Sequence, residues 1–178
     1  MTADLTVRAA RADDLPAITA IYAHHVRHGA ASFELAPPDA AEMRQRYDAI
    51  RALGWPYLVA ERGGEVVGYA YAALYRTRPA YRYTAEDSVY VRHDLAGHGI
   101  GARLMPALIA ACETAGIRQL IAVIGDSANL GSVRLHEKFG FAAIGVLPAV
   151  GWKFGRWVDS VLMQRAIGDG ADSGAPEG

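Results

Sequence analysis

The sequence is poor in cysteine, in long apolar runs and in unbalanced charge. Its single cysteine, Cys112, excludes an internal disulfide and a thiolate metal cluster. No apolar run reaches the roughly 20 residues that a membrane-spanning helix needs. Residues 1–14 carry acidic side chains where a secretion signal would have an apolar core. We therefore expect a cytoplasmic protein that does not enter the membrane.

Neither sign of charge dominates, since 18 Lys and Arg residues stand against 19 Asp and Glu residues, for a formal net charge of −1. Proteins that hold nucleic acids do so mainly through an excess of cationic side chains, so nucleic acid is not an expected partner. His24 and His28 lie four residues apart on a predicted helix, but no third ligand of suitable spacing accompanies them. We predict no metal site.

The length of 178 residues suits one domain, which we place at 1–167, with a disordered tail at 168–178. The apolar periodicity predicts four helices, beginning near residues 15, 39, 99 and 129. It also predicts seven strands, at 5–9, 57–61, 66–74, 84–91, 119–124, 141–150 and 156–165. The early strands follow one another through turns, whereas strand 84–91, helix and strand 119–124 require a parallel crossover. The expected fold is α/β, with a mixed, mostly antiparallel sheet.

The segment between strand 84–91 and the following helix carries alternate glycines at 97, 99 and 101. Backbone N–H groups at the start of a helix bind phosphate when glycines leave them accessible. Three interpretations compete: a glycine turn without a ligand, a general phosphate site, or a dinucleotide site. Gly97, Gly99 and Ala102 match the dinucleotide pattern G-x-G-x-x-A, with Asp126 after the next strand. Antiparallel strands before the loop argue against the dinucleotide fold.

Three ordered motifs resemble the GNAT family of N-acetyltransferases: VYV at 89–91, GHGIG at 97–101 and NLGSVRLHEKFGF at 129–141. Further segments are similar to the phosphinothricin and methionine sulfoximine acetyltransferase branch of that family: ASF at 31–33, RTR at 76–78, TAEDSVYV at 84–91, SVRLHE at 132–137 and GWKFGRWVD at 151–159. The resemblance spans roughly residues 5–167. It implies the GNAT fold, in which a parallel pair of strands splays apart to leave a cleft.

The resemblance implies acetyl-CoA as co-substrate, with its pyrophosphate on the loop and its pantetheine arm paired with strand residues 89–91. The implied cofactor-binding residues are Val89, Tyr90, Val91, Gly97, His98, Gly99, Ile100, Gly101, Ala102 and Asn129. Elementary chemistry agrees, because an anionic pyrophosphate suits a helix N-terminus and an extended amide chain suits an exposed strand edge.

Transfer to an amine requires a base, since the amine is protonated at neutral pH. Glu86 and Ser88 share one face of their strand, and Asp87 points to the other. Glu86 matches the family position of the base; alternatively it is a surface carboxylate or the ion-pair partner of Arg82. His136 occupies the family position of a general acid that returns a proton to the CoA thiolate; alternatively it packs at the helix edge or hydrogen-bonds to the cofactor.

Arg76 and Arg78 precede the same strand and either clamp an anionic acceptor or are ordinary surface residues. The expected substrate-binding residues are Phe33, Arg76, Thr77, Arg78, Glu86, Asp87 and Ser88. The predicted function is acetyl transfer from acetyl-CoA to a small amino-acid-like amine by direct attack in a ternary complex. Peptide acetylation, a dinucleotide-dependent oxidoreductase and a non-catalytic acyl-CoA-binding module remain as alternatives. The family resemblance also implies a homodimer, with the Trp152 and Trp157 hairpin near its interface.

Overall fold

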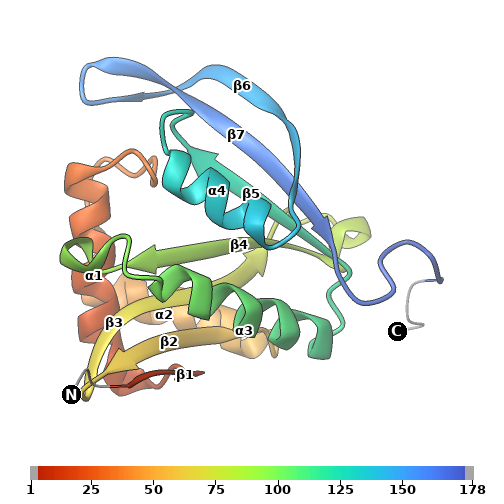
Figure 1. The fold of residues 1–178 in the computed structure, drawn as a ribbon, viewed down its shortest axis with the longest axis horizontal. Coiled ribbons are helices and arrows are strands. Elements are labelled where there is room, and N and C mark those ends of the chain that lie inside the picture. The colour runs from red at the N-terminus through yellow and green to blue at the C-terminus, as the bar shows by residue number, and fades with distance from the viewer. Residues whose placement is uncertain (1–3, 175–178) are drawn as a thin grey trace.

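The computed structural model describes residues 4–174, which form one seven-stranded sheet with helices on both faces (Figure 1). The strands are β1 (Leu5–Ala9), β2 (Tyr57–Arg62), β3 (Glu65–Leu74), β4 (Thr84–Val91), β5 (Gln119–Gly125), β6 (Ala142–Lys153) and β7 (Arg156–Ala166). The helices are α1 (Leu15–His28), α2 (Ala40–Ala52), α3 (Ile100–Thr114) and α4 (Leu130–Lys138). The predicted fold class and order of elements are confirmed.

The sheet order is β1-β2-β3-β4-β5-β7-β6, and β4 with β5 is the parallel pair. Local chemistry explains where the helices start. The Asp39 carboxylate accepts the Glu42 N–H at 2.8 Å and so caps α2, and the Asn129 side chain caps α4 through the Ser132 N–H. These bonds satisfy N–H groups that the first turn of a helix leaves without a partner.

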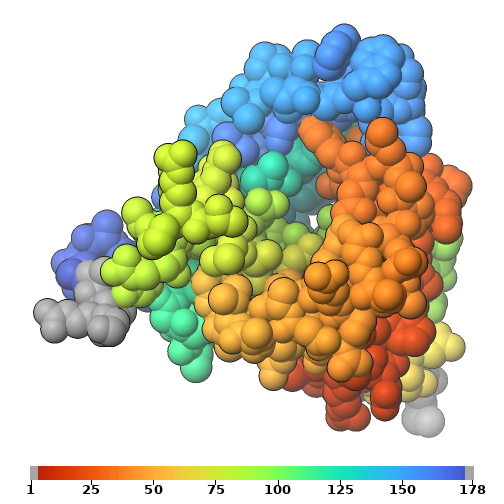
Figure 2. All heavy atoms as spheres, turned by 180° about the vertical axis from the view of Figure 1, so that it is seen from behind, coloured from red at the N-terminus to blue at the C-terminus, as the bar shows by residue number. Residues whose placement is uncertain are grey.

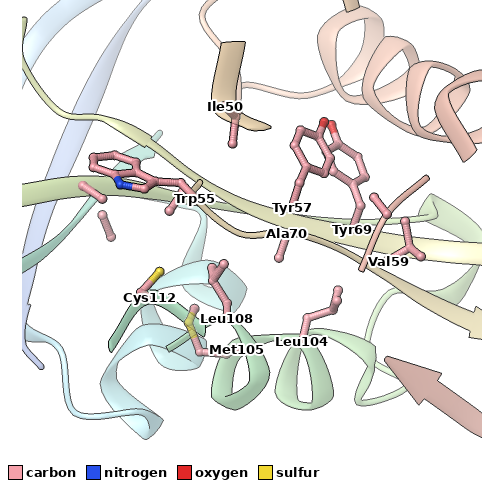
Figure 3. Packing of buried hydrophobic residues seen from close by; sticks show 14 of the residues in the cluster. Ile50, Trp55, Tyr57, Val59, Tyr69, Ala70, Leu104, Met105, Leu108 and Cys112 are labelled. Carbon is pink, nitrogen blue, oxygen red and sulfur yellow. The ribbon is translucent and has the colours of Figure 1, made fainter. Parts of the chain in front are cut away.

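Strand alternation divides the core into two layers (Figure 3). Tyr57 and Tyr69 point towards the side of α1 and α2, while Ala70 faces Leu104 and Leu108 of α3. Small residues on that second side let α3 approach closely: a Cβ on Gly68 would lie 3.0 Å from Ile100 Cγ2. Each fully buried leucine of α3 contributes about 2 kcal/mol to stability.

The parallel pair separates partway along its length. β4 and β5 are paired from Thr84 and Gln119 to Asp87 and Ala122; beyond them, residues 88–91 and 123–125 have no mutual pairing. We call this separation the fork. β5 remains paired with β7 on its other side along its whole length, so β4 is left with a free edge. The predicted splayed pair is confirmed.

β6 is an edge strand with an unusual surface. Its partner is β7, and five large apolar side chains on it are exposed: Ile144, Val146, Leu147, Val150 and Trp152. Phe154 and Trp157 at the hairpin turn are exposed as well, and the Trp157 ring lies 5.2 Å from the Trp152 ring. A contiguous apolar patch on a sheet edge is typical of a surface that another chain covers.

The C-terminal segment follows β7. Within 168–174, which the sequence predicts as part of a disordered tail, Gly168 N–H donates to Glu113 and Asp169 pairs with Arg118. Residues 175–178 of the predicted tail lie outside the described residues. No helix within 4–174 is both long and apolar enough to cross a membrane.

Candidate active site

The glycine loop lines one wall of a large cleft. Gly97 and Gly99 have φ of 80° and 78°, a left-handed conformation that glycine adopts without strain. Gly99 is the N-cap of α3, so the N–H groups of the following three residues have no partner within the helix. The cleft has a volume of about 730 Å³ and runs between this loop and α4.

Nine of the ten predicted cofactor-binding residues line this cleft: Val89, Tyr90, Val91, Gly97, Gly99, Ile100, Gly101, Ala102 and Asn129. His98 is not among the lining residues, and its Nδ1 lies 3.2 Å from the Ala96 carbonyl oxygen. Two cations that the sequence analysis missed, Arg134 and Lys138, line the opposite wall. Their spacing of four residues on α4 is the signal that could have placed them together on one helix face.

The cleft continues into the fork. There a small cavity of about 50 Å³ lies between β4 residues 87–90 and β5 residues 122–125, closed by Asn129, Ser132 and His136 of α4 and its N-cap. The edge of β4 beyond Asp87 has no strand partner. An extended chain of amides can therefore pair with this edge.

Glu86 lies on the opposite side of β4 from α4. Cross-strand pairs Ala73 with Glu86 and Tyr71 with Ser88 put these side chains on the α1 and α2 side of the sheet. Burial raises the pKa of Glu86 to about 7, the negative charge of Asp87 adds to this, and Arg76 opposes it. A carboxylate with a pKa near 7 is matched to accepting a proton at neutral pH.

Among the described residues, Glu86 and Arg82 do not form the ion pair that the sequence analysis gave as an alternative. The Arg82 guanidinium lies over the Tyr83 ring at 4.6 Å and donates to the Pro79 carbonyl oxygen. Within residues 4–174, no hydrogen bond or ion pair engages the Glu86 carboxylate. The carboxylate is half-buried and, with no such partner among the described residues, is available to a ligand.

Asp87 and His136 form a buried pair. His136 Nε2 lies 2.9 Å from Asp87 Oδ2, and His136 Nδ1 lies 2.7 Å from the Ser132 carbonyl oxygen. A carbonyl oxygen only accepts, so Nδ1 carries a hydrogen, and one further proton is shared between Nε2 and the carboxylate. Burial of the ring opposes its charged form, but the hydrogen bond and charge of Asp87 outweigh burial and raise the pKa of His136.

This pair joins β4 to α4 at the point where the fork opens. The Asp87 side chain has no exposed surface, and its Oδ1 has no hydrogen-bond partner among the described residues. The Asp87 side chain therefore points into the fork cavity, whereas Glu86 and Ser88 point to the other side of the sheet. The sequence analysis grouped all three as substrate-binding residues. Both nitrogens of His136 are engaged within the protein.

The face on the α1 and α2 side is hollowed, and the rim of the hollow includes the yellow-green loop between β3 and β4, the orange segment after α1 and the blue hairpin (Figure 2). Arg76, Thr77 and Arg78 are exposed on the loop between β3 and β4. The Arg76 guanidinium lies 5.1 Å from the Tyr75 ring centroid.

Phe33 packs between β5 and β6 at the opposite rim. A Cβ on Gly151 would come within 2.5 Å of the Phe33 ring, and one on Gly125 within 3.0 Å. The buried Lys153 ammonium donates to the carbonyl oxygens of Gly29 and Ser32, at 2.8 and 2.6 Å. These contacts fasten the segment after α1 to the β6–β7 hairpin.

The other histidines do not build a metal centre. His24 stacks on His93 with ring centroids 3.7 Å apart and lies 4.7 Å from His28. Over the range 4–174, no group of three or more His, Cys, Asp or Glu side chains is arranged to hold a metal ion. Cys112 is buried, and burial raises the pKa of its thiol to about 12, so it is not a nucleophile.

Known proteins resemble this chain in sequence and in structure. The family model of the acetyltransferase (GNAT) family matches residues 21–141. A phosphinothricin N-acetyltransferase of Alcaligenes faecalis is 59% identical over 172 residues, covering 97% of this chain and 87% of that protein. An L-methionine sulfoximine/L-methionine sulfone acetyltransferase of Pseudomonas aeruginosa is 41% identical over 160 residues, covering 89% of this chain and 92% of that protein.

A solved structure has nearly the same backbone. It is the GNAT superfamily phosphinothricin acetyltransferase of Sinorhizobium meliloti in complex with acetyl-CoA. Its TM-score is 0.94 and its sequence identity 45%, and the match covers 100% of this chain and 95% of that one.

Proposed function

The chain belongs to the acetyltransferase (GNAT) family, and we propose that it transfers an acetyl group from acetyl-CoA to the amino group of a small amino-acid-like acceptor. The observation that carries the proposal is the arrangement around the fork. The start of α3, with N–H groups that have no partner within the helix, and the free edge of β4 both line the cleft on the α4 side, and the Glu86 carboxylate, with a pKa of about 7, lies on the other side of β4.

The cleft fits acetyl-CoA in shape and charge. The free N–H groups after Gly99, together with Arg134 and Lys138, suit a pyrophosphate and further phosphate. Within 4–174 the edge of residues 88–91 has no strand partner, and the Val91 carbonyl oxygen lies 2.8 Å from His25 Nε2. The remaining N–H and C=O groups of this edge suit the amides of a pantetheine arm. Bound there, acetyl-CoA supplies an acetyl thioester whose thiolate, with a pKa of about 8.5 for an ordinary thiol, is a tolerable leaving group.

Glu86 acts as the general base in this mechanism. It takes a proton from the acceptor ammonium, directly or through a water, which frees the nitrogen lone pair for attack on the thioester carbonyl. The C–N bond forms as the C–S bond breaks; the nitrogen, which still carries two hydrogens, releases one of them as a proton, and the thiolate takes up a proton. The products are the amide and the CoA thiol, and the proton first taken by Glu86 passes to water. His136 is the residue predicted to supply the proton that the thiolate takes up, through the proton it shares with Asp87. Transfer is direct, because the buried Cys112 offers no thiolate for an acetyl-enzyme.

We propose that the acceptor binds on the α1 and α2 side; the direction of the Glu86 and Ser88 side chains supports this. The names of the similar proteins from Alcaligenes faecalis and Pseudomonas aeruginosa support phosphinothricin or methionine sulfoximine as the type of acceptor. Arg76 and Arg78, with Thr77 between them and Phe33 across the hollow, are the proposed contacts to its polar groups. The exposed guanidinium groups suit a carboxylate.

Thermal unfolding and acetyl transfer test the proposal together. Acetyl-CoA at about 100 times its Kd should stabilise the protein by about 2.7 kcal/mol, and NAD should leave the melting temperature unchanged. Acetyl transfer should then follow with free amino acids, phosphinothricin and methionine sulfoximine. Stabilisation by NAD alone would contradict the proposal, and transfer to peptides but to no free amino acid would favour the peptide alternative.

We further propose that two chains associate through the apolar surface of β6 and the Trp152 and Trp157 hairpin. The exposed side chains of the edge strand support this, since a second copy would remove them from water. Acetyl-CoA as co-substrate supports a cytoplasmic location.

A further inference from the structure

The side chain of His25 reaches the free edge of β4, and we propose that it fixes the register in which the pantetheine arm of acetyl-CoA pairs with that edge. The inference rests on the proposed function and names a positioning residue for it. His25 Nε2 lies 2.8 Å from the Val91 carbonyl oxygen, and His25 lines the cofactor cleft. Since a carbonyl oxygen only accepts, Nε2 carries a hydrogen and donates it. Figure 1 shows the arrowhead of β4 beside α1, the helix that carries His25.

The pairing of β3 with β4 shows which backbone groups face the fork. The Arg92 N–H donates to the Val67 carbonyl oxygen at 2.9 Å, so the backbone groups at position 92 point towards β3. Along an antiparallel strand, the residues that bond to the partner alternate with residues whose N–H and C=O groups point to the other edge. The backbone groups of Tyr90 therefore face β3, and those of Val89 and Val91 face the free edge.

The hydrogen bond from His25 removes one of the acceptors on this edge. Beyond the last pair of β4 with β5, at Asp87, the edge-facing carbonyl oxygens are those of Val89 and Val91. The second of these is occupied by the imidazole N–H. A chain that pairs like a strand needs a carbonyl oxygen opposite its own N–H group. The Val89 carbonyl oxygen is then the acceptor left to the arm, and a single alignment is favoured.

Release of the Val91 carbonyl oxygen would permit a second alignment. Equivalent groups on one edge of a strand recur every second residue, which is roughly 7 Å. An arm paired with Val91 instead of Val89 would therefore hold its thioester further from Glu86, while the phosphates stay on the glycine loop. A misplacement of about 1 Å can already cost 100-fold in rate. We therefore expect the hydrogen bond to act on kcat, with little effect on binding of the phosphates.

The His25 ring is held in place by its surroundings. It is half-buried, and its centroid lies 5.4 Å from that of the Tyr90 ring. The buried Tyr22, one turn earlier on α1, packs edge-on against the same ring at 5.1 Å. His28, by contrast, is exposed, and its ring lies 4.7 Å from that of His24, outside the lining of the cleft. The same helix thus offers a matched control position.

Two amide variants at position 25 test the inference. The amide nitrogen of glutamine can take the place of Nε2, whereas that of asparagine is one methylene shorter, corresponds to Nδ1 and does not reach Val91. With phosphinothricin as acceptor, His25→Asn should lower kcat at least tenfold, and His25→Gln should retain kcat within about threefold of the wild type. Adenosine 3′,5′-bisphosphate has phosphates but no arm, and calorimetry should give it the same Kd for all three proteins. His28→Asn is the matched control and should change neither quantity.

The contrast between the two amides separates positioning from structure, because a structural role of the ring would be lost in both. Wild-type kcat in His25→Asn would overturn the inference and leave the proposed function standing. Equal losses in His25→Asn and His25→Gln, weaker binding of adenosine 3′,5′-bisphosphate, or an unfolded His25→Asn in circular dichroism would assign His25 to the structure of the cleft and overturn the inference as well. Absence of acetyl-CoA binding and of transfer to any amine by the wild type would overturn both.

Discussion

Replacing Glu86 with glutamine tests whether this carboxylate acts as a general base or has a structural role. Glutamine preserves the shape of the side chain and cannot accept the proton, so kcat should fall about 100-fold with little change in the acetyl-CoA Kd. In the wild type, a pKa of about 7 leaves roughly a tenth of Glu86 ionised at pH 6 and nine tenths at pH 8. The wild-type rate should therefore rise with pH through 7, and the Glu86→Gln rate should lack that rise.

The same substitution should raise stability in alkaline solution. Folding lifts the pKa of Glu86 from an ordinary 4.5 to about 7, so the folded protein binds more protons than the unfolded chain between these values. Its stability then falls as pH rises from 4.5 through 7. Each pKa unit corresponds to about 1.4 kcal/mol, which makes the cost up to about 3 kcal/mol above pH 7. Glu86→Gln removes this cost, so its free energy of unfolding at pH 8 should exceed that of the wild type.

Steady-state kinetics from pH 6 to 9 and urea unfolding at pH 5 and 8 measure both effects. Asp48→Asn, which removes an exposed carboxylate of α2, is the control and should alter neither profile. Partial recovery of Glu86→Gln at high pH is expected, because the acceptor amine is then neutral. A variant with normal turnover and lower stability would refute the general-base role, and one impaired equally at every pH would assign Glu86 to positioning the acceptor.

Further perturbations address the remaining parts of the site. Gly99→Val should raise the acetyl-CoA Kd at least tenfold in calorimetry, because its φ of 78° starts α3 in a conformation that valine resists; an unchanged Kd would place the phosphates elsewhere. Arg78→Ala should raise the acceptor KM at least tenfold with no effect on acetyl-CoA binding, as loss of a guanidinium contact to an anion does. His136 stabilises the fold fully below pH 6.5, and this stability declines as pH rises through its raised pKa; Asp87→Asn should abolish that decline and lower the ring's titration midpoint in NMR spectra. Val146→Asp on the exposed face of β6 should convert a dimer into a monomer in light scattering, and an unaltered mass would exclude this surface as the interface.

The elements could be predicted because their signals are local. Three of these signals act within a few residues of chain: the cap at Asp39, the glycine loop, and the turn at Phe154 and Gly155. Phe154 and Gly155 both have positive φ. Alternation along β4 likewise predicts that Asp87 points away from Glu86. Its partner His136 lies 49 residues further on, and no local pattern identifies it.

A cavity of about 520 Å³ between the sheet and helices α1 and α2 was not predicted from the sequence, for a related physical reason. Its lining residues come from α1, α2, β2 and β3, and in the sequence each one has the periodicity of an ordinary core position. Whether such positions fill the space between layers or leave it empty depends on how far α2 stands from the sheet, which periodicity does not encode. Phe33 against Gly151 is a similar case, since the space that the ring fills is created by glycines remote in sequence.

The alternation of β4 also bears on how this enzyme can change over generations. Glu86 and Ser88 point to the side of the sheet where we propose the acceptor binds, and Asp87 points to the fork cavity on the other side. If that proposal holds, substitutions at 86 and 88 alter acceptor choice and leave the side chain at 87 unchanged. Insertion or deletion of one residue in this strand would exchange the two sets at once. Acceptor preference can therefore change through single substitutions, whereas a change in the length of β4 would disrupt both sets of side chains.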